Sequence, residues 1–230
     1  MKSFKPLLLA IAALCFGQIA KAQTTVNFNA GLNFSNISVK DANGKKGDTQ
    51  AMPGLRFGFT ADIPVIHDFY LQPGIFYAVK GFKAKGSYNT YSGINVRANY
   101  LDLPVNAIFK SEAGPGKLLV GAGPYISYGM DGTWKSEEGR VIGDIIMDNK
   151  SGDVIYKSDA ADAGSLESYN YGRPWDYGIN VLVGYELWGK FSVQLTSMLG
   201  FANLAPGYNG QNINGTLRNN NWGILLGYKL

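Results

Sequence analysis

The segment Val26-Asn-Phe-Asn-Ala-Gly-Leu-Asn-Phe-Ser35 alternates apolar side chains with polar or glycine residues over ten positions. Successive side chains of a β-strand point to opposite faces of the sheet, so this alternation is typical of a strand with one apolar and one polar face. Glycine supplies 30 of the 230 residues, and charged residues make up only 17%. This composition favours a chain built from many short strands.

The same alternation returns in seven further segments, which span residues 55–63, 69–80, 100–109, 118–129, 175–186, 191–201 and 222–230. A strand tilted by about 45° needs about 9–11 residues to cross the hydrocarbon core of a membrane. Eight such segments are typical of a closed membrane barrel, which leaves no unpaired backbone in lipid. The sequence therefore predicts an all-β fold, an eight-stranded antiparallel transmembrane β-barrel. Its interior is too narrow for a wide water channel.

The polar face of these segments carries six charged residues, which favours a membrane barrel over a soluble sandwich or a lipocalin-like barrel. In a soluble barrel the apolar face fills the interior, and a face so rich in Trp, Tyr and Phe would be hard to pack there. In a membrane barrel the charges point inward and pair as a plug. A narrow conduction path for small ions is the alternative. The six residues are Arg56, Asp62, Lys80, Asp102, Glu186 and Lys229.

The lengths of the predicted connections alternate along the chain. Those at residues 64–68, 110–116 and 188–190 are short. Those at residues 39–52, 81–96, 131–174 and 203–221 are long. With the N-terminus at the periplasm, every short turn is periplasmic and every long loop faces outward, as in outer-membrane barrels.

Aromatic residues gather near both ends of the predicted strands. Aromatic rings favour the headgroup level of a bilayer, so we expect two girdles. One would contain Phe69, Phe109, Tyr185, Trp188, Phe191 and Tyr228, and the other Tyr77, Tyr128, Trp175, Tyr177, Phe201 and Trp222.

Residues 1–22 have the features of a secretory signal peptide. Lys2 and Lys5 precede a short apolar core, and Ala20-Lys-Ala22 is an A-x-A cleavage site. Cleavage after Ala22 leaves a barrel domain at residues 23–230 and removes Cys15, the only cysteine, so we expect no disulfide and no thiolate chemistry. It also removes three lysines and lowers the net charge from +4 to +1, which gives no support to nucleic-acid binding.

Several short runs resemble those of one known family. They are Gly31-Leu-Asn-Phe-Ser-Asn-Ile37, Phe69-Tyr-Leu-Gln-Pro-Gly-Ile-Phe-Tyr77, Asn99-Tyr-Leu-Asp-Leu-Pro104 and the ending Gly227-Tyr-Lys-Leu230. Together they resemble the porin-family, PorT-like outer-membrane β-barrel proteins of Bacteroidetes. The resemblance implies no shared catalytic residues, and the PorT-like name is tied to protein secretion. It also implies a C-terminal aromatic residue that serves the barrel-assembly machinery. Leu230 departs from this pattern, and Tyr228 is the substitute.

Candidate catalytic or metal-binding residues are few. His67 is the only histidine and lies in a predicted turn, so neither a zinc site nor a Ser-His-Asp arrangement is expected. Gly121-Ala-Gly123 lies in a strand pattern with no helix after it, which argues against a phosphate loop. We therefore expect no enzymatic activity, no cofactor and no metal. Calcium bound by the acidic loop described next is the one alternative, although the spacing fits no EF-hand.

The loop at residues 131–174 is the longest expected connection, and it carries eight acidic and five basic residues between Lys135 and Arg173. Its Ile- and Val-rich runs flank Asp148-Asn-Lys-Ser-Gly-Asp153, a sequence typical of a hairpin turn. The sequence thus predicts that the fifth and sixth strands extend outward as a ribbon capped by this turn. We expect the loop to bind any extracellular or secretion partner.

The sequence favours a non-enzymatic protein of the cell outer membrane, structural or interacting through its outer loops. Its expected partners are outer-membrane lipid and the barrel-assembly machinery. A narrow small-solute channel, or an accessory component of protein secretion, is the alternative.

Overall fold

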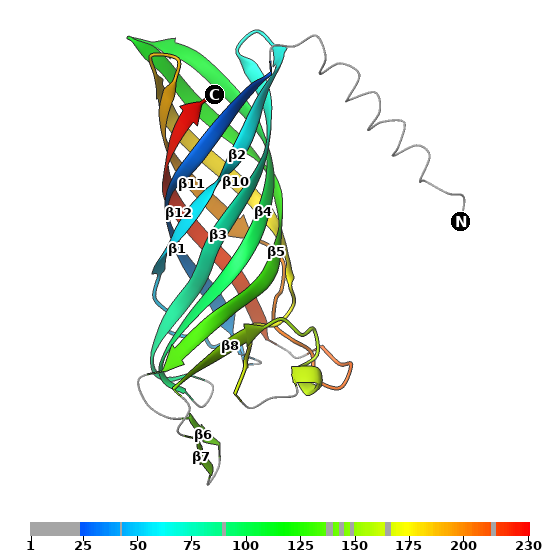
Figure 1. Ribbon diagram of the computed structural model, residues 1–230. Helices are drawn as coiled ribbons and strands as arrows, with labels where there is room; N and C mark the ends of the chain where they lie inside the picture. The colour runs from blue at the N-terminus through cyan, green and yellow to red at the C-terminus, as the bar shows by residue number, and fades with distance from the viewer. Residues whose placement is uncertain are drawn as a thin grey trace, which may run out of the picture.

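The structure is a computed structural model that describes residues 24–41, 43–88, 91–136, 140–142, 145–147, 150–163, 167–212 and 215–230. The side chains of residues 85–92 and 140–149 are outside this description, as is the expected signal peptide at residues 1–22. Eight strands form a closed ring (Figure 1). They are β1 (Thr25–Lys40), β2 (Met52–Ile66), β3 (Phe69–Tyr88), β4 (Tyr91–Ala113), β5 (Gly116–Ser136), β10 (Trp175–Leu187), β11 (Phe191–Gly200) and β12 (Thr216–Lys229).

Every strand of the ring is antiparallel to both of its neighbours, and the first strand, β1, pairs with the last, β12. If the paired residues are followed once around the ring from Val26, the path returns to Asn36, a stagger of ten residues along β1. A staggered register is what allows a twisted sheet to close, with strands tilted by about 35–45° to the barrel axis.

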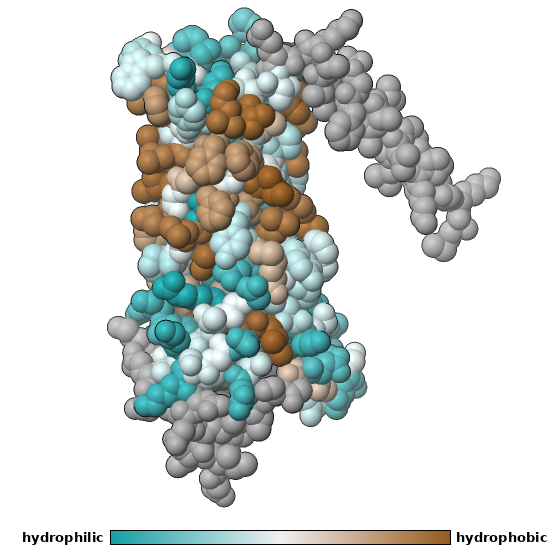
Figure 2. All heavy atoms as spheres, in the orientation of Figure 1, coloured by the Kyte–Doolittle hydropathy of each residue, from teal (hydrophilic) through white to brown (hydrophobic). Residues whose placement is uncertain are grey.

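The predicted alternation is confirmed along the ring. On β1, Phe28 and Leu32 are exposed, whereas Asn29 and Asn33 are buried. The exposed apolar side chains form a band around the middle of the barrel, and hydrophilic side chains cover the end below it (Figure 2). We call this band the apolar belt. Aromatic pairs lie at both of its edges. The ring centroids of Phe69 and Phe109 are 4.9 Å apart, and those of Tyr128 and Trp175 are 4.8 Å apart, with the rings tilted in both pairs.

Short and long connections lie at opposite ends of the ring, as the sequence predicted, except at residues 81–96. Residues 67–68, 114–115 and 188–190 form the short turns, at the end where β1 begins and β12 finishes (Figure 1). The prediction of a long loop at residues 81–96 is wrong, because β3 continues to Tyr88 and β4 begins at Tyr91, and the two strands stay paired to these residues. The extended parts of the two strands are stabilised because their apolar residues, among them Phe82, Ile94 and Val96, are buried inside the barrel.

The segment after β5 also differs from the predicted ribbon. Its first two apolar runs pair with each other as β6 (Arg140–Ile142) and β7 (Ile145–Met147). These two runs are closer in sequence than the two runs that were expected to pair on either side of residues 148–153. The next strand, β8 (Ser151–Ile155), begins inside the expected turn and pairs with the end of β5. Because β8 occupies that edge, β10 does not extend and begins at Trp175.

The remainder of this segment lies at the long-loop end of the barrel (Figure 1). A 3₁₀-helix, η1, spans Ala160–Ala163, and β9 (Tyr169–Asn170) runs parallel to β8. Among the described residues, no helix is long and apolar enough to cross a membrane.

Candidate functional site

The interior of the ring is the candidate site, because buried charged and polar side chains from most of the strands meet there. Three groups follow one another from the short-turn end to the long-loop end. We call them the Lys110 cluster, the Asp102 cluster and the apolar cap.

The Lys110 cluster lies nearest to the short turns. Lys110 Nζ contacts Asp62 Oδ2 at 2.8 Å and Glu186 Oε2 at 3.0 Å, so one cation from β4 joins carboxylates from β2 and β10. Gln72 Nε2 donates to the other oxygen of Asp62 at 2.7 Å, and Asn27 Nδ2 donates to Oδ2 at 3.0 Å. The two Lys110 ion pairs join strands that are not neighbours in the ring, so they cross-link the interior as well as balance the charge, whereas the two amide hydrogen bonds join neighbouring strands.

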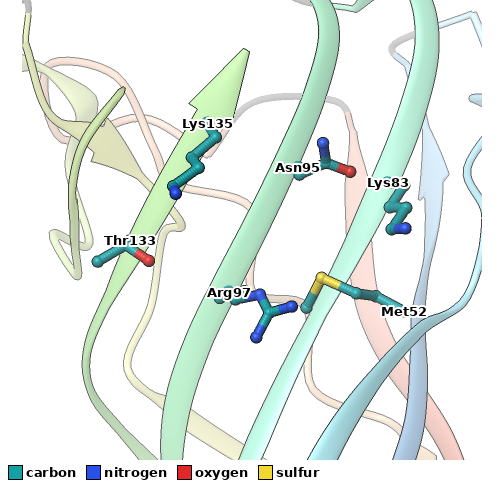
Figure 3. Close-up of a pocket in the computed structure, with 6 residues that line it drawn as sticks. All are labelled: Met52, Lys83, Asn95, Arg97, Thr133 and Lys135. Atoms are coloured by element: carbon teal, nitrogen blue, oxygen red, sulfur yellow. The ribbon is translucent and has the colours of Figure 1, made fainter. Parts of the chain in front are cut away.

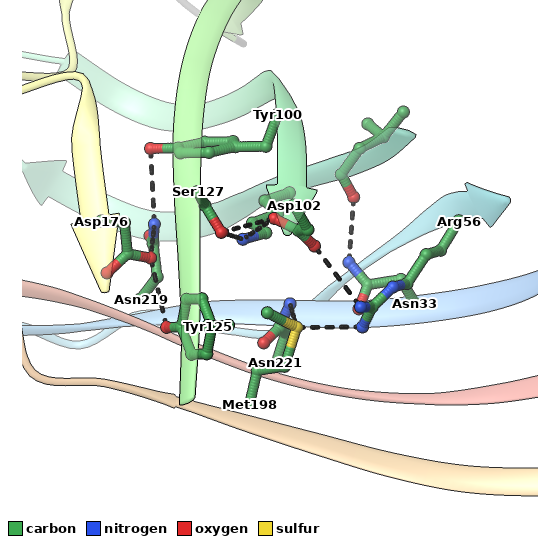
Figure 4. A network of polar contacts seen from close by, with 12 residues as sticks. Asn33, Arg56, Tyr100, Asp102, Tyr125, Ser127, Asp176, Met198, Asn219 and Asn221 are labelled. Atoms are coloured by element: carbon green, nitrogen blue, oxygen red, sulfur yellow. Dashed lines mark hydrogen bonds and ion pairs between the residues drawn. The ribbon is translucent and has the colours of Figure 1, made fainter. Parts of the chain in front are cut away.

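The Asp102 cluster occupies the middle of the barrel (Figure 4). Lys80 Nζ lies 2.6 Å from Asp102 Oδ1, and Arg56 Nη2 lies 3.7 Å from Oδ2. Ser127 Oγ donates a hydrogen bond to Asp102 Oδ1 at 2.6 Å. The Arg56 guanidinium lies over the Phe76 ring, with its Cζ 4.5 Å from the ring centroid. The side chain of Asp102 is 0% exposed, and two cations and a hydroxyl group surround it. Buried charges are tolerated in protein interiors when they are paired in this way.

Asp176 lies beside the Asp102 cluster but makes no ion pair among the described residues. Its Oδ2 accepts hydrogen bonds from Tyr125 Oη at 3.4 Å and from Asn219 Nδ2 at 3.1 Å (Figure 4). Asn219 in turn accepts a hydrogen bond from Tyr171 at 2.7 Å. Asp176 is therefore held by neutral donors alone, and its hydrogen bonds lead from the charged middle toward the long-loop end.

The apolar cap closes the barrel at the long-loop end. Buried side chains of β3, β4 and β5 meet Val154 from β8 and Tyr171, which follows β9. Tyr156 also packs here, with its ring edge-on to Tyr100 at 5.8 Å between centroids. Gly129 makes room for it, because a Cβ atom at that position would overlap the Tyr156 ring. The other buried members include Ile37, Phe82, Ile94, Val96, Trp134, Leu204 and Leu217.

One exposed carboxylate joins two loops above this cap. Asp159 accepts backbone hydrogen bonds from Gly210 at 2.6 Å, Ala161 at 2.9 Å and Asn209 at 3.1 Å. The hydrogen bond from Gly210, followed by that from Ala161, holds the pKa of the Asp159 carboxyl below its ordinary value. The residues after β8 are thereby attached to the loop that leads from β11 to β12.

The structure places five of the six predicted interior charges inside the barrel, where they lie in the two charged clusters. They are Arg56, Asp62, Lys80, Asp102 and Glu186. Lys229 is a correction: it lies at the end of β12, half-exposed, and makes no ion pair among the described residues.

Sequence reasoning missed two buried charges, Lys110 and Asp176. Lys110 has the same parity as Asp102, but it follows the last residue of the predicted strand at residues 100–109 and so falls in the predicted turn at residues 110–116. Asp176 stands on the polar face of its segment, and this position is the signal that could have identified it. With these two residues, the described interior holds the cations Arg56, Lys80 and Lys110 against four carboxylates.

The remaining candidates from the sequence stay apart from the interior clusters. His67 lies in the exposed turn after β2. Gly121 and Gly123 lie within β5, a strand of the ring. Among the described residues, no three His, Cys, Asp or Glu side chains come together to hold a metal ion. Of the eight loop acids, Glu137, Glu138, Asp144 and Asp148 fall outside the described residues or side chains.

An antiparallel ring of eight strands with an apolar outer belt and a polar, filled interior defines a β-barrel of the outer-membrane type. The chain belongs to the outer membrane protein β-barrel domain family, whose sequence profile matches residues 16–205. No curated protein matches the chain significantly by sequence.

Three solved structures are similar to this chain over most of its length. Ail, the attachment invasion locus protein of Yersinia pestis, solved with the heparin analogue sucrose octasulfate, has 11% identity and a TM-score of 0.40, with 90% of this chain and 99% of that one covered. OprG from Pseudomonas aeruginosa has 10% identity and a TM-score of 0.43, with 91% and 97% covered. Neisserial surface protein A has 10% identity and a TM-score of 0.40, with 89% and 97% covered.

Proposed function

We propose that this chain is a non-enzymatic protein of the cell outer membrane that spans the bilayer as a closed barrel and interacts through its outer loops. Membership of the outer-membrane barrel family supports this placement, as does the signal-peptide pattern of residues 1–22. The apolar belt supplies the surface that meets lipid. In this placement the short turns face the periplasm, and the long loops face outward.

Residues 131–174 are the proposed partner surface. This segment contains the paired strands β6 and β7, which form a separate two-stranded sheet among the residues that the structure describes. It also forms the loop over the apolar cap. Its partner is an extracellular or secretion component, and the motifs shared with PorT-like proteins support the second of these. Outer-membrane lipid and the barrel-assembly machinery are the other proposed partners, with Tyr228 as the C-terminal aromatic residue for assembly.

The filled interior is the observation that carries the closed-barrel proposal. The Lys110 cluster, the Asp102 cluster and the apolar cap occupy successive levels of the ring. In a narrow channel, polar groups line a continuous aqueous path instead. The buried Phe82, Tyr100 and Trp134 side chains of the cap interrupt such a path.

We therefore expect no steady conductance from the purified mature chain in planar lipid bilayers. The same preparation should migrate faster on unboiled than on boiled SDS gels, which shows that the barrel is folded. A chain that is heat-modifiable and also gives a stable, long-lived conductance would overturn the closed-barrel proposal in favour of the narrow channel. Recovery of the mature chain as a soluble periplasmic protein would overturn the membrane placement itself.

A further inference from the structure

A hollow of about 360 Å³ opens on the outer face of β3, β4 and β5, beyond the edge of the apolar belt (Figure 3). Three of the residues around it are cationic and two are neutral hydrogen-bonding residues. The lining consists of Met52, Lys83, Asn95, Arg97, Thr133 and Lys135. None of these residues belongs to the interior clusters.

The strand register accounts for the way the three cations gather. Lys83, Asn95 and Lys135 lie opposite one another in one row across β3, β4 and β5, and Arg97 lies opposite Thr133 in the adjacent row. Their sequence neighbours Phe82, Val96 and Trp134 are buried inside the barrel. Since side chains alternate along a strand, the cations project outward.

In the part of the chain that the structure describes, no carboxylate is paired with these cations. Among the described residues, Lys83, Arg97 and Lys135 form no ion pair within 4.0 Å. Two acidic residues lie nearby in the register. Asp131 accepts a hydrogen bond from Asn99, and the exposed Asp153 lies opposite Thr133 on β8. The described lining therefore carries a positive charge that an anion would balance.

Met52 gives the hollow an apolar floor. Residue 81 is a glycine with φ of 150°, and a Cβ atom there would lie 2.8 Å from Met52 Cε. Met52 is 1% exposed, so its side chain fills the space that a larger residue 81 would need. The result is a concave site with cationic and polar walls over an apolar floor.

The position of the hollow along the barrel axis indicates which part of a membrane lies beside it. Tyr77, Leu101 and Tyr128 lie opposite one another at the edge of the apolar belt. Arg97 is four residues beyond Leu101, or about 10 Å along the axis of a tilted barrel. Phospholipid headgroups extend only about 5–7 Å beyond the hydrocarbon core. Arg97 can reach down to them, whereas Lys83 and Lys135, two residues higher, meet a headgroup only if it is larger.

We propose that this hollow binds the phosphorylated sugar headgroup of a glycolipid in the outer leaflet. The inference rests on the outer-membrane placement proposed above. The planar guanidinium of Arg97 presents paired donors to a phosphate group, and the two lysines add charge. Asn95 and Thr133 supply hydrogen bonds to sugar hydroxyls. Basic pockets between the helices of other membrane proteins bind anionic lipid headgroups through the same kind of charge pairing.

The test uses the mature chain folded in phosphatidylcholine nanodiscs that contain a small fraction of diphosphorylated lipid A or of the same lipid without its phosphates. Bound lipid is measured after extraction by mass spectrometry. The variant carries K83Q, R97Q and K135Q. The matched control carries K40Q, K157Q and K190Q, which remove the same charge at exposed positions away from the hollow.

We expect the wild type and the control to retain diphosphorylated lipid A in preference to the dephosphorylated lipid. The hollow variant should lose about tenfold or more of this preference, since each cation near a membrane surface contributes to anion binding. Equal retention by all three proteins would overturn the proposal. So would binding of soluble glucosamine phosphate as strong as that of lipid A, because the ligand would then be soluble.

Failure of the outer-membrane placement gives a different result. In that case the wild type would not form the heat-modifiable species in nanodiscs of either composition. The hollow variant and the control should both form it, because the substituted side chains make no ion pair that holds the ring.

Discussion

At the scale of single residues, the interior contrasts two buried aspartates. Asp102 faces Lys80 and Arg56, whereas Asp176 is held by Tyr125 and Asn219 alone. The sequence showed which face Asp102 occupies, since it alternates with Leu101 and Leu103. It did not show which cation pairs with which carboxylate, because pairing depends on the stagger between strands far apart in the chain.

Asp102→Asn should destabilise the folded barrel more than Asp176→Asn. The first substitution leaves two buried cations without their counter-charge, and breaking a buried ion pair costs about 3–5 kcal/mol. An asparagine at position 176 still accepts a hydrogen bond, so its cost should be near that of one neutral hydrogen bond, about 1 kcal/mol. Denaturant unfolding in liposomes, followed by tryptophan fluorescence, measures both. Equal losses would show that the two carboxylates have similar environments.

At the scale of elements, the eight ring strands were predictable because each has one apolar face, a local property of the sequence. The path of residues 131–174 was not. Its Ile and Val runs have several possible partners, and the nearest pairing formed β6 and β7. The position of β8 depends on the free edge of β5, which exists only once β4 and β5 have extended beyond the belt.

Gly129→Val should detach the loop over the apolar cap while the ring stays closed. A side chain at position 129 needs the space that the Tyr156 ring fills, and this ring packs on Tyr100. Limited trypsin digestion of the folded protein should then cleave at Lys157 faster than in the wild type. Ala122→Val, at an exposed position on the same strand, is the control and should leave the cleavage rate unchanged. Unchanged cleavage in the Gly129 variant would show that Tyr156 does not anchor the loop.

The link between the two outer loops through Asp159 should weaken in acid. Because the pKa of this carboxyl is held below its ordinary value of about 3.9, the link is fully present above that pH and is lost as the pH falls through the lowered pKa. Hydrogen exchange, corrected for intrinsic rates, should show the Gly210 amide protected at pH 6 and less protected near pH 2. In Asp159→Ala the protection should be low at both values. If protection of the Gly210 amide in the wild type does not change with pH, Asp159 is not the acceptor that protects this amide.

At the scale of the whole molecule, the apolar belt and the sorted connections were both predictable, since each sums many local signals. The closed long-loop end was not, because it combines residues from β1, β3, β4, β5, β12 and the loop over them. No single segment of the sequence contains enough of this cap to indicate it.

Val181→Arg tests whether the apolar belt meets lipid. Val181 is exposed near the middle of β10, and arginine at the midplane of a bilayer costs about 2–4 kcal/mol in a membrane barrel. The free energy of unfolding in liposomes should fall by this amount, whereas Val181→Leu should be nearly neutral. If the arginine variant is as stable as the leucine variant, the outer face of the ring does not lie in hydrocarbon.

The seam between β1 and β12 has a consequence for how the protein is made. Asn27 lies opposite Lys229, so the ring closes through contacts between residues about two hundred positions apart. Such distant pairings are slow to form, because the entropy cost of closing a long loop comes before the paired strands gain any stabilising contact. Until then, β1 presents an open edge that invites pairing with other chains. A chain of this topology is therefore prone to aggregate until its last strand has paired with its first and closed the ring.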